Sequence, residues 1–231
     1  MTDIVSYELK DGVATITMDD GKANALSHAM FDQLGAAFDK AEEAGAVVVL
    51  KGREGRFSGG FDLKEMYKGP DEAKALTKRG SEFAVRIMSF NTPVIGVSTG
   101  HCIAMGAYTM LACDYRIGAD GDFKVGLNET AIGMPMHRFG IELGRYKIPK
   151  NYFNRSLING EIFNPKDAVK AGYYDRLVPA DQLDAAGAMA GQMFAQLKMN
   201  AFSYTKNAAR KELFALFEEC IADDLKMGLD L

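Results

Sequence analysis

The chain has 231 residues, of which 48% are hydrophobic and 25% are charged, and its formal net charge is −4. This composition is typical of a soluble globular protein large enough for one compact domain. The absence of a basic cluster argues against nucleic-acid binding. Three cysteines without regular spacing predict reduced thiols in a cytoplasmic protein, rather than a disulfide framework or a metal site.

The first part of the sequence predicts strands that alternate with helices. Residues 5–10 and 13–18 flank Asp11 and Gly12, a dipeptide that is a strong signal for a β-hairpin. Apolar residues at helical spacing then run from 24 to 45, and the continuous apolar stretch "AVVVLKG" predicts a strand buried on both faces. This alternation indicates parallel strand pairing and an α/β core.

A long uncharged segment lies between Arg86 and Asp114. It follows a predicted helix over 70–90, and we divide it into a buried strand "PVIGVSTG" and a short buried helix "MGAYTMLAC". The polar, glycine-rich "STGHC" in its middle argues against a membrane-spanning helix. We therefore expect no membrane partner, and "DYRIGAD" continues the chain as another strand.

The last third of the chain is mainly helical. Helical patterns cover "RFGIELGRYKI", "NPKDAVKAG", "ADQLDAAGAMAGQMFAQL" and a final amphipathic run from about 201 to 229, with a brief strand "DRLVP" among them. No repeat or low-complexity linker divides the chain, so we expect one folded unit. The helix-rich last third is expected to act as a lid or an assembly arm. Its last amphipathic helix has no sheet of its own to cover, so its apolar side (Leu213, Leu216, Phe217 and Ile221) is expected to be available to a neighbouring subunit.

Two glycine-containing bends each precede a predicted helix. In "RFSGGFDLKEM", two glycines lie between a strand and a helix, and in "TGHCIAMGAYTM" the residues Ala104, Met105 and Gly106 open the second helix. Backbone N–H groups at a helix start have no partner inside the helix and can receive negative charge. Two such bends facing each other would form an oxyanion hole. From the pattern alone, an ordinary turn is the better explanation of each bend.

Four segments of the sequence together resemble the crotonase family, which is the enoyl-CoA hydratase/isomerase superfamily. The two glycine-containing bends resemble the family's paired oxyanion-hole segments, "NAL" lies upstream of them, and "GLNETAIGM" resembles the family's Pro-Glu-any-any-any-Gly segment. The resemblance covers about residues 5–178. It implies a crotonase-like α/β fold of repeated ββα units, with a core and acyl-CoA site in 1–178 and a helical trimerisation or lid region in 179–231.

The resemblance also assigns roles to individual residues. The oxyanion donors fall on the N–H groups of Phe61 and Met105, and the glutamate of the fourth segment falls on Glu129. The contacts to coenzyme A and the acyl group fall on Ala23, Ala25, Ser58, Gly60, Asp62, Gly106 and Tyr108. Coenzyme A enters as part of the thioester substrate, no permanently bound cofactor is implied, and the assembly is a homotrimer or a dimer of trimers.

One departure from the family pattern bears on the reaction. The hydratases of the family use two glutamates, but Tyr108 stands at the position of the first. A single carboxylate suffices to move a proton between two carbons, so we expect Glu129 to isomerise the double bond of an enoyl-CoA in fatty acid metabolism. Tyr108 would shape the pocket or hold a water molecule. A hydratase, a thioester hydrolase or decarboxylase, and an inactive acyl-CoA binder remain alternatives.

Other polar residues are weaker candidates. His101, in the strand-to-helix loop, is more simply explained by a hydrogen bond near a turn, and His137 with Arg138 by a partly solvated loop pair. Ser58 has no base nearby in the sequence that would make it a nucleophile. Lys22 is a candidate for a phosphate contact, although two aspartates precede it closely.

Overall fold

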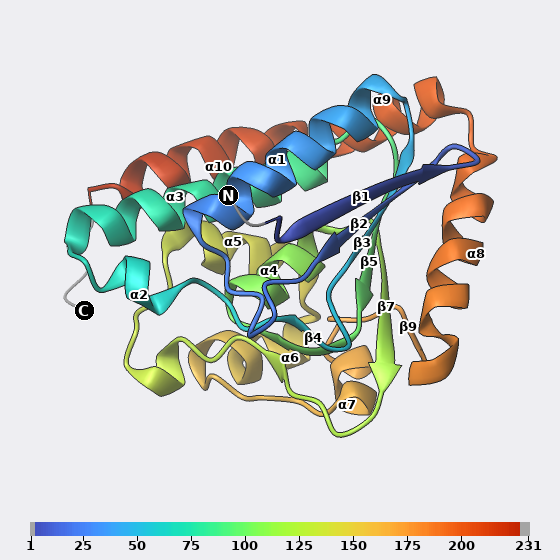
Figure 1. Ribbon diagram of the computed structural model, residues 1–231. Helices are drawn as coiled ribbons and strands as arrows, with labels where there is room; N and C mark the ends of the chain where they lie inside the picture. Colours follow the sequence, from blue (N-terminus) through green and yellow to red (C-terminus); the bar gives the residue numbers. More distant parts are fainter. Residues whose placement is uncertain (1–2, 227–231) are drawn as a thin grey trace.

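A computed structural model of the chain describes residues 3–226, which form two β-sheets with helices around them (Figure 1). The larger sheet has the strand order β1-β2-β3-β5-β7-β9, and the smaller one has the order β4-β6-β8. Among the strands described in residues 3–226, β1 and β2 pair in antiparallel fashion and the other strand pairs are parallel. The strands are β1 (Val5–Lys10), β2 (Val13–Met18), β3 (Val47–Lys51), β4 (Gly55–Ser58), β5 (Val94–Ser98), β6 (Gly100–Ile103), β7 (Tyr115–Asp120), β8 (Val125–Gly126) and β9 (Arg176–Pro179).

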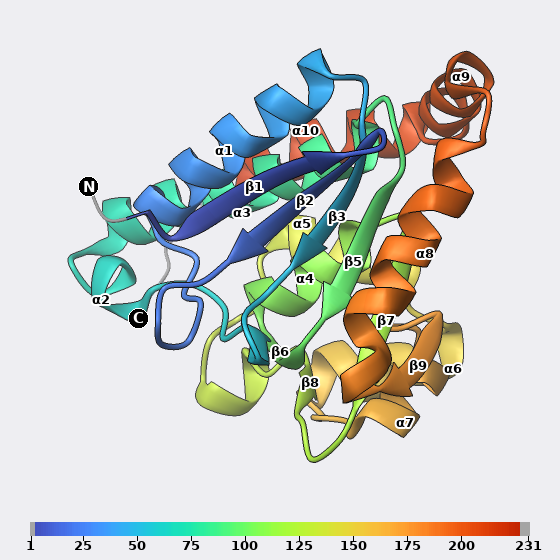
Figure 2. The same cartoon turned by 45° about the vertical axis from the view of Figure 1, so that its right-hand side comes forward.

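The helices cover both faces of the larger sheet, and α8 lies on the opposite face from α1 and α3 (Figure 2). The close contact of α8 with the sheet depends on two of its glycines, since a Cβ at Gly191 would lie 2.8 Å from the Val13 side chain and one at Gly187 would lie 3.1 Å from Val97. The α-helices are α1 (His28–Glu43), α2 (Leu63–Met66), α3 (Pro70–Ser89), α4 (Met105–Ala112), α5 (Arg138–Lys147), α6 (Lys150–Phe153), α7 (Pro165–Lys170), α8 (Leu183–Ala195), α9 (Met199–Ala209) and α10 (Lys211–Asp224).

The predicted hairpin and buried strands are present. Asp11 and Gly12 both have positive φ values (50° and 76°), as the tightest hairpin turns require. The uncharged segment after Arg86 forms β5, β6 and the fully buried α4, which confirms that burial explains its missing charges. Among the helices described between residues 3 and 226, none is long and apolar enough to cross a membrane.

The chain is built from repeated ββα units, and the second strand of each later unit enters the smaller sheet. Strands β4, β6 and β8 are therefore parallel neighbours, although β6 and β8 were not distinguished in the sequence. Because parallel strands end at the same edge of a sheet, their following segments meet there. This edge brings together residues from three distant parts of the chain.

The prediction for the final amphipathic run was wrong in two respects. The chain forms two helices, α9 and α10, with a break at Arg210. The apolar side of α10 is also already partly covered, because it packs on α3 and α5 of the same chain, where Leu213, Leu216 and Ile221 are partly buried. Phe217 is fully buried, with its ring centroid 4.7 Å from that of Phe139. Residues 227–229 of the predicted run lie outside the described residues, and the trimeric assembly stays a prediction.

Helices α9 and α10 are fastened to the core by the buried carboxylate of Asp114. This carboxylate accepts hydrogen bonds from the Val94 N–H (3.0 Å), the Lys206 ammonium (2.6 Å) and the Arg210 guanidinium (3.2 Å). The Lys206 side chain is only 3% exposed, so removal of Asp114 would leave a buried cation without its counterion.

We therefore expect Asp114→Ala to lower the free energy of unfolding by about 3–5 kcal/mol, measured by urea denaturation. Asp167→Ala is the control, because Asp167 pairs with the exposed Lys170 at the surface and its loss should have a much smaller effect. Equal midpoints for the wild type and Asp114→Ala would contradict this role of Asp114.

Candidate active site

The candidate site lies where the three strands of the smaller sheet end. Phe61 follows the end of β4 by three residues, Met105 follows the end of β6 by two, and Glu129 follows the end of β8 by three. The sheet thus brings both predicted oxyanion donors and the predicted base to one edge. The spacing of these residues in the sequence gives no hint of the distance between them.

The first bend, residues 58–61, is held by hydrogen bonds on one side. The Leu26 N–H donates to the Gly60 carbonyl (2.8 Å), and the Asp62 N–H donates to the Leu26 carbonyl (3.3 Å). In this parallel pairing the amide of the intervening residue, Phe61, faces the opposite side. Within residues 3–226 the Phe61 N–H has no hydrogen-bond acceptor.

The second bend turns sharply at Ala104. This residue has φ 51° and ψ −126°, a conformation that costs a non-glycine residue about 1–3 kcal/mol. Met105 follows as the first residue of α4, so its N–H has no partner inside the helix, and no acceptor outside the helix is found for it in the described part of the chain. Strain at Ala104 therefore accompanies a free amide at Met105.

The two bends are in direct contact. A Cβ placed on Gly60, which has φ 97°, would lie 2.8 Å from the Ala104 Cβ and 3.5 Å from the Met105 nitrogen. Only a glycine allows this approach without a shift of the second bend. The geometry therefore places the two free amides, of Phe61 and Met105, on adjoining pieces of backbone, as an oxyanion hole requires.

A cavity of about 460 Å³ opens beside these bends. Five of the predicted site residues line it, namely Ala23, Ala25, Phe61, Asp62 and Glu129. The Phe61 ring lies so close to α3 that a Cβ at Gly80 would be 2.7 Å from it. The volume is within the range of small-molecule sites, and its wall is largely apolar, as expected for a pocket that binds an acyl chain.

Glu129 occupies a shielded position on this wall. The residue as a whole is half-buried because it borders the cavity, but its Oε2 is shielded from solvent and has no hydrogen-bond partner in the described chain. Burial raises the pKa of Glu129 from 4.5 to about 7. A carboxyl group with such a pKa can accept and return a proton near neutral pH.

The family model for enoyl-CoA hydratase/isomerase matches residues 8–228. The chain belongs to this family. It is 42% identical to an enoyl-CoA hydratase/isomerase family protein from Pseudomonas syringae, with a TM-score of 0.96 and 98% of each chain covered. It is 33% identical to a Mycobacterium tuberculosis protein that one solved structure names an enoyl-CoA isomerase, with a TM-score of 0.89 and 98% and 97% covered. A second structure of that protein, with a TM-score of 0.91, names it a probable enoyl-CoA hydratase. It is 28% identical over 221 residues to the mitochondrial enoyl-CoA delta isomerase 1 of Rattus norvegicus. This alignment covers 90% of the present chain and 74% of the rat protein.

The family match confirms the resemblance that the four motifs indicated, and the structural neighbours confirm the crotonase-like fold. The matched region extends well past residue 178, where the resemblance in the motifs ended. The helical C-terminal part of the chain is therefore also shared with the enoyl-CoA hydratase/isomerase family.

Several of the residues predicted to bind the substrate do not line the cavity. Ser58 is fully buried, where its hydroxyl donates to the Asn24 carbonyl (2.7 Å) and accepts from the Gly60 N–H (3.1 Å). Gly106 is covered by Ser58, since a Cβ there would lie 2.7 Å from the Ser58 Cβ. Gly60 and Met105 likewise contribute through the backbone of the bends. These residues form the layer beneath the cavity wall and hold the bends in place. Nothing in these contacts supports Ser58 as a nucleophile.

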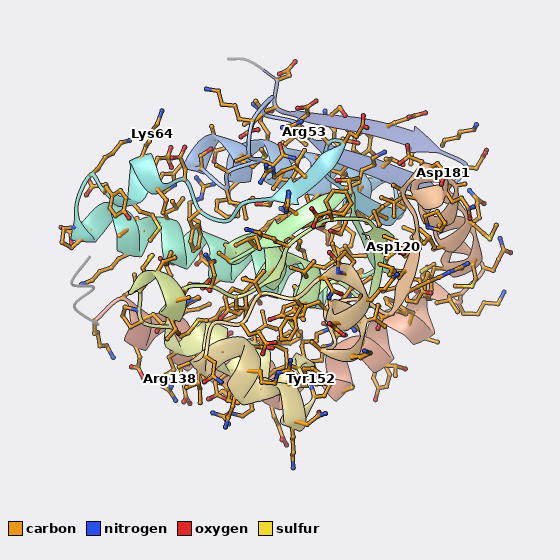
Figure 3. All side chains as sticks on the ribbon, turned by 90° about the horizontal axis from the view of Figure 1, so that it is seen from below. Arg53, Lys64, Asp120, Arg138, Tyr152 and Asp181 are labelled. Atoms are coloured by element: carbon orange, nitrogen blue, oxygen red, sulfur yellow. The ribbon has the colours of Figure 1, made fainter. Side chains whose placement is uncertain are left out.

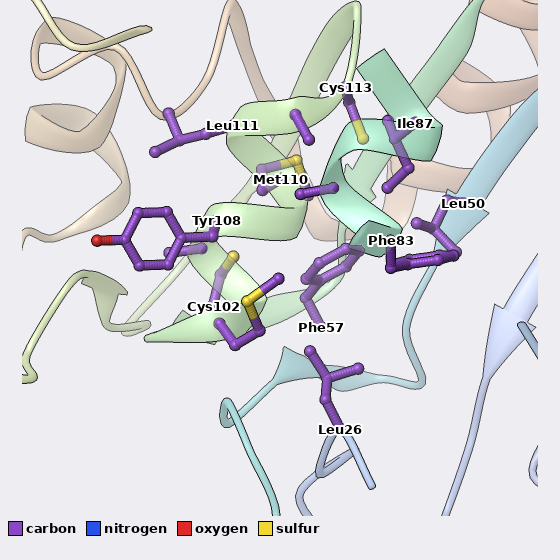
Figure 4. Packing of buried hydrophobic residues seen from close by; sticks show 14 of the residues in the cluster. Leu26, Leu50, Phe57, Phe83, Ile87, Cys102, Tyr108, Met110, Leu111 and Cys113 are labelled. Carbon is purple, nitrogen blue, oxygen red and sulfur yellow. The ribbon is translucent and has the colours of Figure 1, made fainter. Parts of the chain in front are cut away.

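Tyr108 also lies behind the cavity wall. Its ring projects from α4 on the side opposite Phe57 and Phe83 (Figure 4), and its hydroxyl contacts the Met136 sulfur at 3.1 Å. Burial raises the pKa of Tyr108 well above its ordinary value, with a smaller contribution from the Glu129 charge, so the phenol stays protonated. Tyr108 therefore borders the site near Glu129 without entering it.

Of the weaker candidates, the structure places His101 and Arg138 away from the cavity and His137 on its wall. His101 accepts a hydrogen bond from the Lys124 N–H (3.0 Å) away from the cavity, which confirms its explanation as a turn residue. Arg138 forms an ion pair with Asp223, on a different side of the molecule from Lys64 at the cavity (Figure 3). His137, by contrast, is 9% exposed and lines the cavity. The prediction that His137 and Arg138 form a partly solvated pair in a loop was therefore wrong for His137.

The sequence analysis missed several other residues of the wall. They are Thr77 from α3, Met66 from α2, Ala104 from the second bend, and Asn128, Ile132, Met134 and Pro135 around Glu129. The available signal for Thr77 was a threonine beside Leu76, at a position that the helical spacing of the apolar residues places on the buried face of α3. Among residues 3–226, no cluster of histidine, cysteine and carboxylate side chains is suited to a metal ion.

The contact between the bends can be tested with Gly60→Ala. The added methyl group would collide with Ala104 and force the two amides apart, so kcat for enoyl-CoA turnover should fall about 10²- to 10³-fold, as for the loss of one oxyanion donor. Gly12→Ala is the matched control, because Gly12 also has a positive φ but no atoms near its Cβ position. Wild-type kcat in Gly60→Ala would show that the spacing of the bends is unimportant.

Proposed function

We propose that this protein isomerises 3-enoyl-CoA to 2-enoyl-CoA, with Glu129 as the single acid–base residue. The observation that carries the proposal is the uncommitted Oε2 of Glu129 in a cavity beside two uncommitted backbone amides. The other carboxylate on the cavity wall, that of Asp62, already accepts the Lys64 N–H at 2.8 Å as a helix cap. A relative named as an enoyl-CoA delta isomerase supports this choice of reaction, and the Mycobacterium tuberculosis relative is named an isomerase in one structure and a probable hydratase in another.

In the proposed reaction the thioester oxygen of the substrate accepts hydrogen bonds from the N–H groups of Phe61 and Met105. Glu129 removes a proton from C2, and the electron pair of the broken C–H bond moves into the dienolate. The negative charge collects on the thioester oxygen, where each amide stabilises it by about 3–4 kcal/mol. Glu129 then returns the proton to C4, and the double bond moves to the C2–C3 position. Atoms and charge balance without a co-reactant.

The environment of Glu129 suits both half-reactions. With a pKa of about 7, the carboxylate is a strong enough base when ionised and a strong enough acid when protonated. Hydration of 2-enoyl-CoA would need a second group to position and split the water. The side chain at the corresponding position, Tyr108, is turned toward Met136, which favours isomerisation over hydration.

We propose that the coenzyme A part of the substrate lies along residues 22–25 and α2. Ala23 and Ala25 line this end of the cavity, and the Lys22 carbonyl is fixed by the Arg53 guanidinium, whose Nε lies 2.9 Å away. The nearby Asp20 carboxylate accepts hydrogen bonds from the backbone N–H groups of Lys22, Asn24 and Ala25 at 2.7–3.1 Å. These donors partly offset its negative charge and weaken its repulsion of a phosphate group. Lys22 and Lys64 are then the cations nearest to the phosphates.

The reaction is tested with Glu129→Gln, assayed with 3-enoyl-CoA and with 2-enoyl-CoA. We expect kcat for isomerisation to fall about 10²- to 10⁴-fold, because the amide cannot accept the C2 proton. Glu8→Gln, at an exposed position on the edge strand β1, which contributes no residue to the cavity wall, is the matched control. Unchanged turnover in Glu129→Gln would show that Glu129 is not the acid–base residue. Faster hydration than isomerisation in the wild type would show that the protein is a hydratase and would contradict the proposed reaction.

The pH dependence gives a second test. Because Glu129 must be ionised to remove the C2 proton, kcat/KM of the wild type should rise about tenfold per pH unit below pH 7 and level off above it. The sign follows from the raised pKa: protonation of Glu129 inactivates the free enzyme at a higher pH than for an ordinary glutamate. A profile that is flat from pH 5 to 8 would contradict this assignment.

A further inference from the structure

Two polar side chains without partners lie together on the cavity wall. Thr77, on the buried face of α3, and His137, immediately before α5, both line the cavity that contains Glu129. Both also line a small gap on the far side of this wall. They are therefore neighbours that separate the cavity from the gap. The proposed isomerisation gives neither of them a role.

His137 is held in a fixed orientation with a free nitrogen. The residue is 9% exposed, and its Nε2 is shielded from solvent and has no hydrogen-bond partner in the described chain. Its ring packs edge-on against the Tyr108 ring, with 5.7 Å between the ring centroids, and stacks on the Phe139 ring, with 6.0 Å between the centroids. The Asp224 carboxylate also caps the first turn of α5 by accepting the N–H groups of Arg138 (2.6 Å) and Phe139 (3.0 Å).

Thr77 presents a second free group at the same place. It is 7% exposed, and its carbonyl accepts the Ser81 hydroxyl at 3.0 Å, whereas its own hydroxyl has no partner within residues 3–226. A threonine inside a helix commonly donates its hydroxyl to the carbonyl one turn earlier. The Thr77 hydroxyl does not do so and is available to a ligand in the cavity.

The cavity ends at Thr77 and His137, because the gap behind these two residues is very small. Its volume is about 10 Å³, which is at the lower limit for a single water molecule, and Ile221, Asp224 and Leu225 of the C-terminal segment cover it. An acyl chain cannot continue through it. The atoms of a bound chain that reach Thr77 and His137 must therefore satisfy these polar groups or leave them buried without partners.

The chemistry of the pair selects an uncharged oxygen. Burial lowers the pKa of His137, against the opposing effect of Asp224, so the ring is neutral near pH 7 and has one donor and one acceptor nitrogen. A hydroxyl group can both donate and accept, and so it matches His137 in either tautomer as well as the Thr77 hydroxyl. A carboxylate would add negative charge to a cavity that already contains Glu129.

We propose that Thr77 and His137 form a polar subsite that binds a hydroxyl group on the acyl chain, so that hydroxylated acyl-CoA thioesters are preferred over unsubstituted ones. This inference rests on the proposed function, since it takes the ligand of the cavity to be an acyl-CoA. It adds a specificity that the position of Glu129 does not determine.

The experiment measures dissociation constants by isothermal titration calorimetry, with saturated acyl-CoAs that cannot react. The ligands are an unsubstituted medium-chain acyl-CoA, its isomers with a hydroxyl at successive carbons beyond C4, and the analogue with a terminal carboxylate. We expect at least one hydroxyl isomer to bind the wild type about tenfold more tightly than the unsubstituted chain. Thr77→Val and His137→Phe should each reduce this ratio toward one, and Thr77→Ser should retain it.

The matched control is His101→Phe, which replaces a histidine outside the cavity and should keep the wild-type ratio. Binding of the unsubstituted acyl-CoA and an unchanged melting temperature show that each variant is folded, and Thr77→Val serves alone if His137→Phe does not fold. No preference in the wild type, a ratio that survives both substitutions, or a preference for the carboxylate would overturn the subsite. If no acyl-CoA binds the wild type at all, the proposed function itself fails.

Discussion

The site depends on the close contact between two bends of the backbone, at residues 58–61 and 103–105. Gly60 permits the contact, and Ala104 takes a strained conformation within it. The hydrogen bonds that the first bend makes to the rest of the backbone are directed to residues 23–26, which leaves the Phe61 amide on the open side. Because both free donors belong to the main chain, the chemistry of the site tolerates side chains as large as phenylalanine and methionine there.

The repeated ββα units give this contact its frame, and the C-terminal helices support its outer wall. The smaller sheet ends at the bends and at Glu129, so one edge of three short strands carries both the proposed oxyanion donors and the proposed base. Helix α10 caps α5 through Asp224, directly next to His137. The wall of the cavity is thereby tied to the end of the chain.

Much of the fold could be predicted from local signals in the sequence. The Asp11-Gly12 turn, the uninterrupted apolar strands and the glycine-containing bends depend on nearby residues alone, and the structure contains them all. The smaller sheet could not be found in this way, because β8 has only two residues and is defined by its pairing with β6. The packing of α10 was also misjudged, since an amphipathic pattern does not show which surface covers it. Thr77 and His137 meet only through the tertiary fold, so their shared position could not be predicted from their spacing.

The central claim is that the amides of Phe61 and Met105 bind one thioester oxygen. A crystal structure with a saturated acyl-CoA in the cavity tests it most directly. The mechanism predicts that the thioester oxygen lies about 2.7–3.1 Å from both amide nitrogens, with C2 of the acyl chain facing the Glu129 carboxylate. A thioester oxygen bound elsewhere, or amides that point away from each other around the ligand, would contradict it.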